Sequence, residues 1–343
     1  MKKILFLLGT FLLVSCFPEP EFPDDPYNFG GGVIIVNEGN FNSGNGSLSF
    51  YSYDSLQIYN DIFYTANGRP LGDVPNSVNY SNNRLYVVIN NSGKIEELNP
   101  LTFKSISTVT GLKSPRNMLV NNGKGYVTSL WSDSLAVIDL SEMKVSDYID
   151  LKKSSEAITG LGNRVFISSW MGGNKVMEIN SVTDEVTDSV EVGTEPETMV
   201  IDKNFRLWVL CTGGWQKLHN PELDVININT MTIERRYVFP LESSPTCLRI
   251  DAYGEILYFL DGGVRRMEIN SVTLPANPFI PQQTGIFYKM GVNTADGHIF
   301  VTDVADYVHK GYVYIFDHNG DFLEKYQTGI IPGEMTFRIQ VKD

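Results

Sequence analysis

The chain has 343 residues, with 40 acidic and 27 basic side chains and a formal net charge of −13. Nucleic acid and anionic lipid repel so acidic a chain, which excludes both as its main partner. Three cysteines are too few for a disulfide-dependent scaffold. The length suits either two average domains or one large all-β domain.

The first residues carry the features of a bacterial export signal. Lys2 and Lys3 form a short positive region, and the apolar run from Ile4 to Leu13 is too short to span a bilayer. The following Leu-Val-Ser-Cys16 resembles the lipobox of bacterial lipoproteins, in which the cysteine becomes the acylated first residue. We predict a signal peptide at residues 1–15, lipidation at Cys16 and attachment to the outer membrane. The alternative is an ordinary signal peptide that happens to contain a cysteine.

Residues 16–29 form a predicted tether between the lipid and the folded body. Four prolines and four acids follow Cys16 in this stretch, a composition that neither packs nor forms a helix. An acidic stretch directly after the acylated cysteine resembles the surface-export signals of Bacteroidetes lipoproteins. We therefore expect a protein that faces the outside of the cell, with a periplasmic orientation as the alternative.

A repeat runs through the rest of the chain. An apolar strand that ends in Asp or Asn recurs at intervals of 40 to 49 residues, the period of a four-stranded propeller blade. Asp and Asn suit this place because their side chains bond the backbone two residues further on. The seven strand ends are Asp54, Asn99, Asp139, Asn180, Asn229, Asn270 and Asp317.

The two ends of the chain complete one repeat. A proline that opens a short strand recurs at Pro75, Pro115, Pro196, Pro245 and Pro332, and no ladder bond is needed at that first position. Residues 33–37 read as a second strand without a first, whereas residues 332–339 read as a lone first strand. The sequence therefore predicts an all-β, seven-bladed β-propeller over residues 30–343, in which the C-terminal strand completes the first blade and closes the ring.

Two cysteines lie in the predicted propeller, Cys211 and Cys247. No neighbouring residues have zinc-ligand spacing, so no metal site is predicted. We expect two buried thiols, and the alternative is a single bridge between neighbouring blades.

The strands of each repeat are labelled A, innermost, to D, outermost. In a propeller the B–C and D–A connections open on the same face, and the longer insertions are predicted there: residues 38–46, 67–70, 212–222 and 304–311. Aromatic residues gather just beyond the B strands, at Phe41, Trp131, Trp170, Trp215 and Tyr307. Rigid aromatic side chains give a large contact area at low entropic cost. They predict a small-molecule binding face, with packing between blades as the alternative for any single tryptophan.

Polar residues at strand ends are predicted beside these aromatic side chains, where they could orient a ligand by hydrogen bonds. Asn90, Asp133 and Glu156 also belong to this group, and many of its members are expected only to satisfy loop backbone. The predicted ligand contacts are Asn37, Glu38, Arg116, Asn117, Glu197, Asp261 and Asp303.

The opening Val-Asn37-Glu38-Gly-Asn-Phe41, followed by Gly-Ser-Leu-Ser-Phe-Tyr51, resembles YncE-like propeller surface lipoproteins of Bacteroidetes. Their BtuG members capture cobalamin and related corrinoids and pass them to a TonB-dependent transporter. The resemblance implies that the aromatic face holds a corrinoid and that a transporter is the partner. A fold shared by many functions gives this inference limited weight.

No catalytic residue and no cofactor are predicted, because the chain has no Gly-x-Ser-x-Gly, His-Glu-x-x-His or phosphate-binding motif. His219 and His309 occupy two inserted loops, where a shared metal is the alternative to solvated side chains. Glu38, Asn117 and Asp261 could imitate the calcium ligands of propeller lactonases. Three functions therefore stay open: ligand capture without turnover, which we favour, a protein-interaction scaffold, and a calcium-dependent hydrolase.

Overall fold

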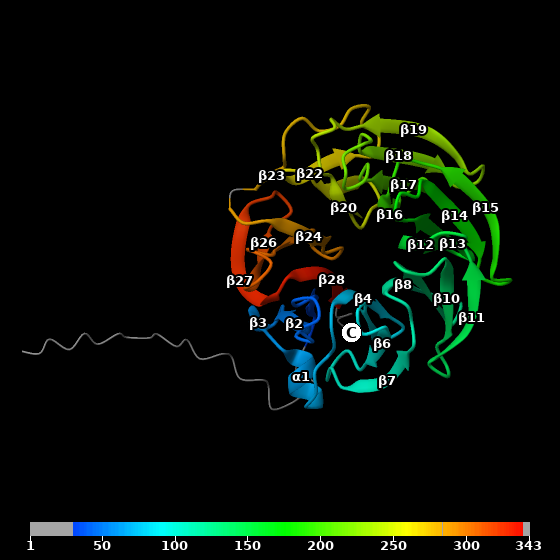
Figure 1. Cartoon of the computed structure of the whole chain (residues 1–343). Coiled ribbons are helices and arrows are strands. Elements are labelled where there is room, and N and C mark those ends of the chain that lie inside the picture. Colours follow the sequence, from blue (N-terminus) through cyan, green and yellow to red (C-terminus); the bar gives the residue numbers. More distant parts are fainter. Residues whose placement is uncertain (1–29, 283, 339–343) are drawn as a thin grey trace, which may run out of the picture.

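A computed structural model describes residues 30–282 and 284–338, so Cys16 and the predicted tether lie outside the described residues. Seven four-stranded antiparallel sheets form a ring (Figure 1), and we call the axis around which the A strands stand the central channel. The structure confirms the predicted seven-bladed β-propeller. No helix among the described residues is long and apolar enough to cross a membrane.

Blade one joins the two ends of the described chain. Its sheet has the order β28-β1-β2-β3, so the last strand supplies the innermost position, as predicted. Ile35 lies opposite Met335 in the pairing of β1 with β28. The Arg338 guanidinium donates to the carbonyls of Gly30 and Pro100, which ties the end of β28 to blades one and two. The bounds are β1 Gly32–Asn37, β2 Ser47–Ser52, β3 Gln57–Tyr59 and β28 Pro332–Arg338.

The other six blades follow in chain order, each from strand A to strand D. Blade two holds β4 Pro75–Ser81, β5 Arg84–Ile89, β6 Lys94–Leu98 and β7 Ser105–Thr110. Blade three holds β8 Pro115–Asn121, β9 Lys124–Ser129, β10 Ser134–Asp139 and β11 Lys144–Asp150. Blade four holds β12 Ser155–Leu161, β13 Arg164–Ser169, β14 Lys175–Asn180 and β15 Glu185–Glu191.

The last three blades complete the ring. Blade five holds β16 Pro196–Ile201, β17 Arg206–Cys211, β18 Glu222–Asn227 and β19 Thr232–Val238. Blade six holds β20 Thr246–Ile250, β21 Ile256–Leu260, β22 Gly263–Glu268 and β23 Ile280–Pro281. Blade seven holds β24 Phe287–Val292, β25 Ile299–Asp303, β26 Lys310–Phe316 and β27 Phe322–Ile330.

Burial explains why the B strands are rich in apolar residues. Both faces of β5 are covered by neighbouring blades, and every residue of the strand after Arg84 is buried. The outermost β15 carries no buried residue and is mostly polar. Apolar clusters such as Phe166, Leu207 and Val209 fill the space between adjacent blades. The continuous apolar runs are therefore interblade core, and the polar runs are the solvated rim.

One connection contains a helix that was not predicted from the sequence. The D–A connection of blade one holds a short helix, α1 (Ile62–Asn67), whose Ile62 and Phe63 are buried in the apolar cluster between blades one and two. Asn67 Nδ2 donates to the Phe103 carbonyl, and the Ser105 amide donates to Asn67 Oδ1. Ser105 is the first residue of β7, next to the C–D connection of blade two. Residues 67–70 therefore do not lie on the face where the sequence placed them. Six residues are too few to show a helical period.

We call the face that carries the B–C and D–A connections the loop face, and the opposite one the turn face. Three of the predicted insertions, at residues 38–46, 212–222 and 304–311, follow B strands and lie on the loop face. Residues 269–279 form a long C–D connection in blade six, so one sizeable insertion lies on the turn face. The expectation that all insertions share one face is therefore wrong.

Removal of β28 should destabilise the ring, because blade one would lose its innermost strand along with Met335 and Phe337 from the interblade core. We expect a chain that ends at Ile331 to lose at least about 4 kcal/mol of unfolding free energy, the cost of emptying two large core positions. Equilibrium denaturation measures this loss. A chain that ends at Arg338 keeps β28 and should match the full chain, and equal stability of the two truncated chains would contradict the closure.

Candidate functional site

The start of every A strand is distorted in the same way. In all seven blades the register between strands A and B breaks within the first four residues of strand A, as between Pro115 and Met118 or Pro196 and Thr198. A β-bulge re-aims side chains and is frequent beside functional sites. Here the bulges surround the mouth of the central channel on the loop face.

A sharp turn precedes four of these strands. Val74, Ser114, Glu195 and Ile331, each directly before a proline, have φ between 41° and 54°. This left-handed region is costly for residues other than glycine. The turns bring the chain from the outer rim directly to the channel, so the first residues of each A strand face its mouth.

A cavity of about 280 Å³ occupies this mouth and is lined by charged side chains from most of the blades. Its lining includes four of the predicted contacts, Glu38, Arg116, Asn117 and Glu197. The sequence also placed Glu156 in this group, and it lines the cavity as well. The charged and aromatic lining residues missed from sequence are Arg249, Tyr288, Lys289 and Glu334.

On one side of the cavity, Arg116 and Glu156 form a two-pronged ion pair. Arg116 Nε and Nη2 donate to the two carboxylate oxygens of Glu156 at 2.7 and 2.8 Å. Burial alone would lower the pKa of Arg116, but the carboxylates of Glu156 and Glu38 outweigh it and leave the pKa raised. Such fork geometry is the strongest common form of ion pair in proteins, so this side chain is firmly positioned.

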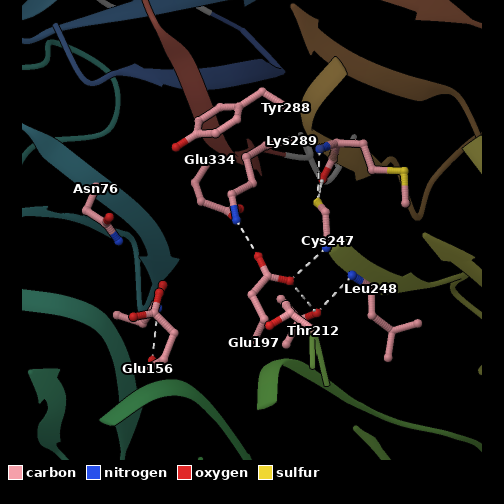
Figure 2. Close-up of polar contacts among 12 residues, drawn as sticks. Asn76, Glu156, Glu197, Thr212, Cys247, Leu248, Tyr288, Lys289 and Glu334 are labelled. Atoms are coloured by element: carbon pink, nitrogen blue, oxygen red, sulfur yellow. Dashed lines mark hydrogen bonds and ion pairs between the residues drawn. The ribbon is translucent and has the colours of Figure 1, made fainter. Parts of the chain in front are cut away.

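On the other side, Glu197 of blade five contacts blades six and seven. Lys289 Nζ donates to Glu197 Oε1 at 2.7 Å, and the Cys247 amide donates to Oε2 at 2.9 Å (Figure 2). Burial would raise the pKa of Glu197, but Lys289 and the Cys247 amide hold it below its usual value. Arg249 pairs with Glu334 of β28 at 2.6 Å. The closing strand is therefore part of this charged network.

Glu38 differs from the other three glutamates of the cavity. Its carboxylate accepts a hydrogen bond of 2.9 Å from the Tyr288 hydroxyl, and the described residues offer it no ion pair within 4.0 Å. Burial raises the pKa of Glu38, against the smaller opposing effects of Tyr288, Arg116 and Lys289. One hydrogen bond and no ion pair therefore stabilise its negative charge.

A second concavity, the tryptophan groove, lies across the B–C connections of blades three to five. Trp131, Trp170 and Trp215 line this groove of about 870 Å³, together with Met171 and Leu218 among others. Trp215 is 83% exposed and Trp131 63% exposed. The structure thus brings together the three tryptophans that the sequence placed beyond B strands. The fourth, Trp208, is buried and donates to Asp202.

The loop that presents Trp215 depends on a glycine. Gly213 has φ 77°, and a β-carbon at this position would lie 2.2 Å from the His219 carbonyl oxygen. The Gly213 amide is also bonded to the Thr194 carbonyl. A side chain at this position would force the loop open and displace Trp215.

The remaining predicted contacts lie elsewhere. Asn37 is fully buried and bonds Ser47, Ser49 and Gly329. Asp303 is also buried, and its carboxylate accepts from loop amides. Both side chains form hydrogen bonds with backbone amides or with side chains of neighbouring strands, and neither reaches the loop surface.

Three further predicted contacts line neither the cavity nor the tryptophan groove. Asp261 accepts from the Ser244 amide and lies 3.7 Å from Arg265. Phe41 is exposed, and the Tyr307 ring lies edge-on to Tyr288, with 6.1 Å between ring centroids. Neither Phe41 nor Tyr307 lines the tryptophan groove, so the five predicted aromatic residues do not form one surface.

A family model described as Domain of unknown function (DUF5074) matches residues 31–330. The chain belongs to the DUF5074 family. No curated protein matches it. Among solved structures, a quinonprotein alcohol dehydrogenase-like protein from Bacteroides thetaiotaomicron is 16% identical with a TM-score of 0.70, over 90% of this chain and 78% of that one. A putative 6-phosphogluconolactonase from Bacteroides fragilis is 12% identical with a TM-score of 0.68, over 90% of this chain and 98% of that one.

These likenesses of the DUF5074 protein to solved structures show the propeller fold alone, since both identities are low. The residues proposed to imitate a lactonase calcium site are not assembled: Glu38 and Asn117 line the cavity and Asp261 does not. His219 lines the tryptophan groove, whereas His309 bonds Asp306. Over residues 30–282 and 284–338, no group of three or more His, Cys, Asp or Glu is arranged to hold a metal.

The two thiols of the DUF5074 protein should be unreactive in the folded state. Cys211 and Cys247 are free and fully buried, and burial raises the pKa of Cys247 to about 11. The reactive thiolate is therefore scarce at pH 8. For residues 30–343, which contain every strand of the ring, we expect a thiol reagent to label neither cysteine natively and both after denaturation. Rapid native labelling, or one disulfide after denaturation, would contradict this arrangement.

Proposed function

We propose that this DUF5074 protein captures a small molecule in the tryptophan groove and releases it chemically unchanged. The observation that carries the proposal is the convergence of Trp131, Trp170 and Trp215 from three blades on one concavity of about 870 Å³. Large apolar side chains left exposed in a concave surface are the usual sign of a binding site.

The composition of the groove narrows the kind of ligand. Its lining contains no lysine and no arginine, and its charged or titratable members are Glu195 and His219. An anionic group would find no basic partner there, so the proposed ligand presents a neutral or cationic, flat surface to the tryptophans. The side-chain amides of Asn174 and Gln216 in the lining would offer hydrogen bonds to such a ligand.

A corrinoid is the ligand we propose within this class. The support is the resemblance of residues 36–51 to BtuG-type surface lipoproteins, together with a groove wide enough for several aromatic contacts. A corrin ring is a broad macrocycle that several tryptophans can contact at once. Hand-off to a TonB-dependent outer-membrane transporter is the corresponding proposal for the partner.

The position of the first described residues fits a surface lipoprotein. Gly30 lies beside Arg338 at the turn face, where β1 begins and β28 ends. A lipid on Cys16 would therefore hold the body by its turn face, and the tryptophan groove would point away from the membrane. This orientation supports capture from the medium.

Titration of residues 30–343 with cyanocobalamin and with cobinamide tests the ligand. We expect submicromolar binding, a weakening of at least about tenfold on Trp131→Ala or Trp215→Ala, and recovery of the ligand unchanged. Phe205→Ala is the matched control, because Phe205 is an exposed aromatic residue in the A–B turn of blade five on the turn face. Absence of heat and of a melting-temperature shift with both corrinoids would remove this assignment.

Lipidation is tested separately. Cys16→Ser removes the thiol that the lipid would occupy, so the protein should move from the membrane fraction to the soluble fraction and lose incorporation of labelled palmitate. Cys247→Ser is the control for loss of an unrelated thiol. Equal membrane recovery of the Cys16→Ser chain and the unchanged chain would contradict a lipid anchor at this position.

A further inference from the structure

The central cavity is chemically unlike the tryptophan groove. Its lining has four carboxylates, from Glu38, Glu156, Glu197 and Glu334, and three cations, from Arg116, Arg249 and Lys289. Each cation already has a carboxylate within 2.7 Å: Arg116 with Glu156, Arg249 with Glu334, and Lys289 with Glu197. The surplus carboxylate is Glu38.

The side-chain amides of Asn76 and Asn117 in the cavity lining add acceptors rather than donors. Asn76 Nδ2 donates to the Arg116 carbonyl at 2.8 Å, and Asn117 Nδ2 donates to the Glu156 carbonyl at 3.0 Å. Both amide groups are thereby oriented, and no donor among the described residues reaches either Oδ1. Asn76, Tyr288 and Lys289, labelled in Figure 2, all line the cavity. With its cations paired, the cavity can accept hydrogen bonds and one positive charge.

We propose that the central cavity binds a small organic monocation, such as a protonated primary amine, with Glu38 as its counter-charge. With one bound monocation, the cavity would hold four negative and four positive charges. An anion would meet three neutralised cations and one free carboxylate, so it is disfavoured. The cavity of about 280 Å³ has room for an amine head group and a short chain.

Glu38 must be ionised to act as the counter-charge. Because burial raises its pKa, the site loses its negative charge as the pH falls through that pKa, and the affinity for a cation falls with it. The other titratable groups facing Glu38 are Tyr288, Lys289, Arg116 and Glu334. The first three each have a raised pKa and therefore keep their protons over the same range.

Calorimetric titration of residues 30–343 with butylammonium at pH 8 tests the proposal, with 1-butanol as the uncharged probe of the same shape. We expect butylammonium to bind, 1-butanol not to bind, and Glu38→Gln to weaken butylammonium at least about tenfold, the scale of one charge-assisted hydrogen bond. The affinity of the unchanged protein should fall toward acidic pH, whereas that of Glu38→Gln should not.

Two controls separate this site from the tryptophan groove. Glu195→Gln removes a carboxylate that lines the groove but not the cavity, and it should leave butylammonium affinity within about twofold. Trp131→Ala should also leave it unchanged, even where it abolishes corrinoid binding. Equal binding of butylammonium and 1-butanol, unchanged affinity in Glu38→Gln, or no butylammonium binding would each overturn the proposal.

Discussion

The pairing of β28 with β1 is the contact on which the other features depend. It joins the two ends of the described chain in one sheet and leaves the ring without an open circular edge. It also assembles the cavity, because Glu334 comes from β28 and Glu38 directly follows β1. Loss of this pairing would separate Glu334 from Arg249 and open the channel mouth on one side.

The number of blades and the closure could be predicted because both repeat signals have a physical cause. Asx-type turns recur at the ends of C strands, as when Asn99 and Asp139 bond amides two residues on. Prolines recur where strand A needs no ladder bond. The departures had no such signal: α1 is shorter than two helical turns, and residues 269–279 have ordinary loop composition.

The position of a residue in the repeat predicted about half of the charged residues that line the cavity. Arg116 and Glu197 directly follow landmark prolines, and the structure places both at the channel mouth. Arg249 was missed because it lies beyond the bulge of β20, four residues after Pro245, and Lys289 was missed because no landmark proline opens its strand. Asn37 has the residue type of a ligand contact, yet it bonds buried serines. Residue type alone cannot separate these two roles.

The two concavities differ in how strongly the fold constrains them. The cavity consists of ion pairs between different blades, and removal of one partner would leave a buried charge unpaired at a cost of about 3–5 kcal/mol. Trp131 and Trp215 of the groove are largely exposed and come from B–C connections, so their removal costs the fold little. Substitutions in the groove would therefore change the binding of the proposed ligand without unfolding the propeller. Glu38 lines the cavity, but it forms no ion pair with a cation of the protein. Replacement by Gln would therefore leave no buried charge without a partner.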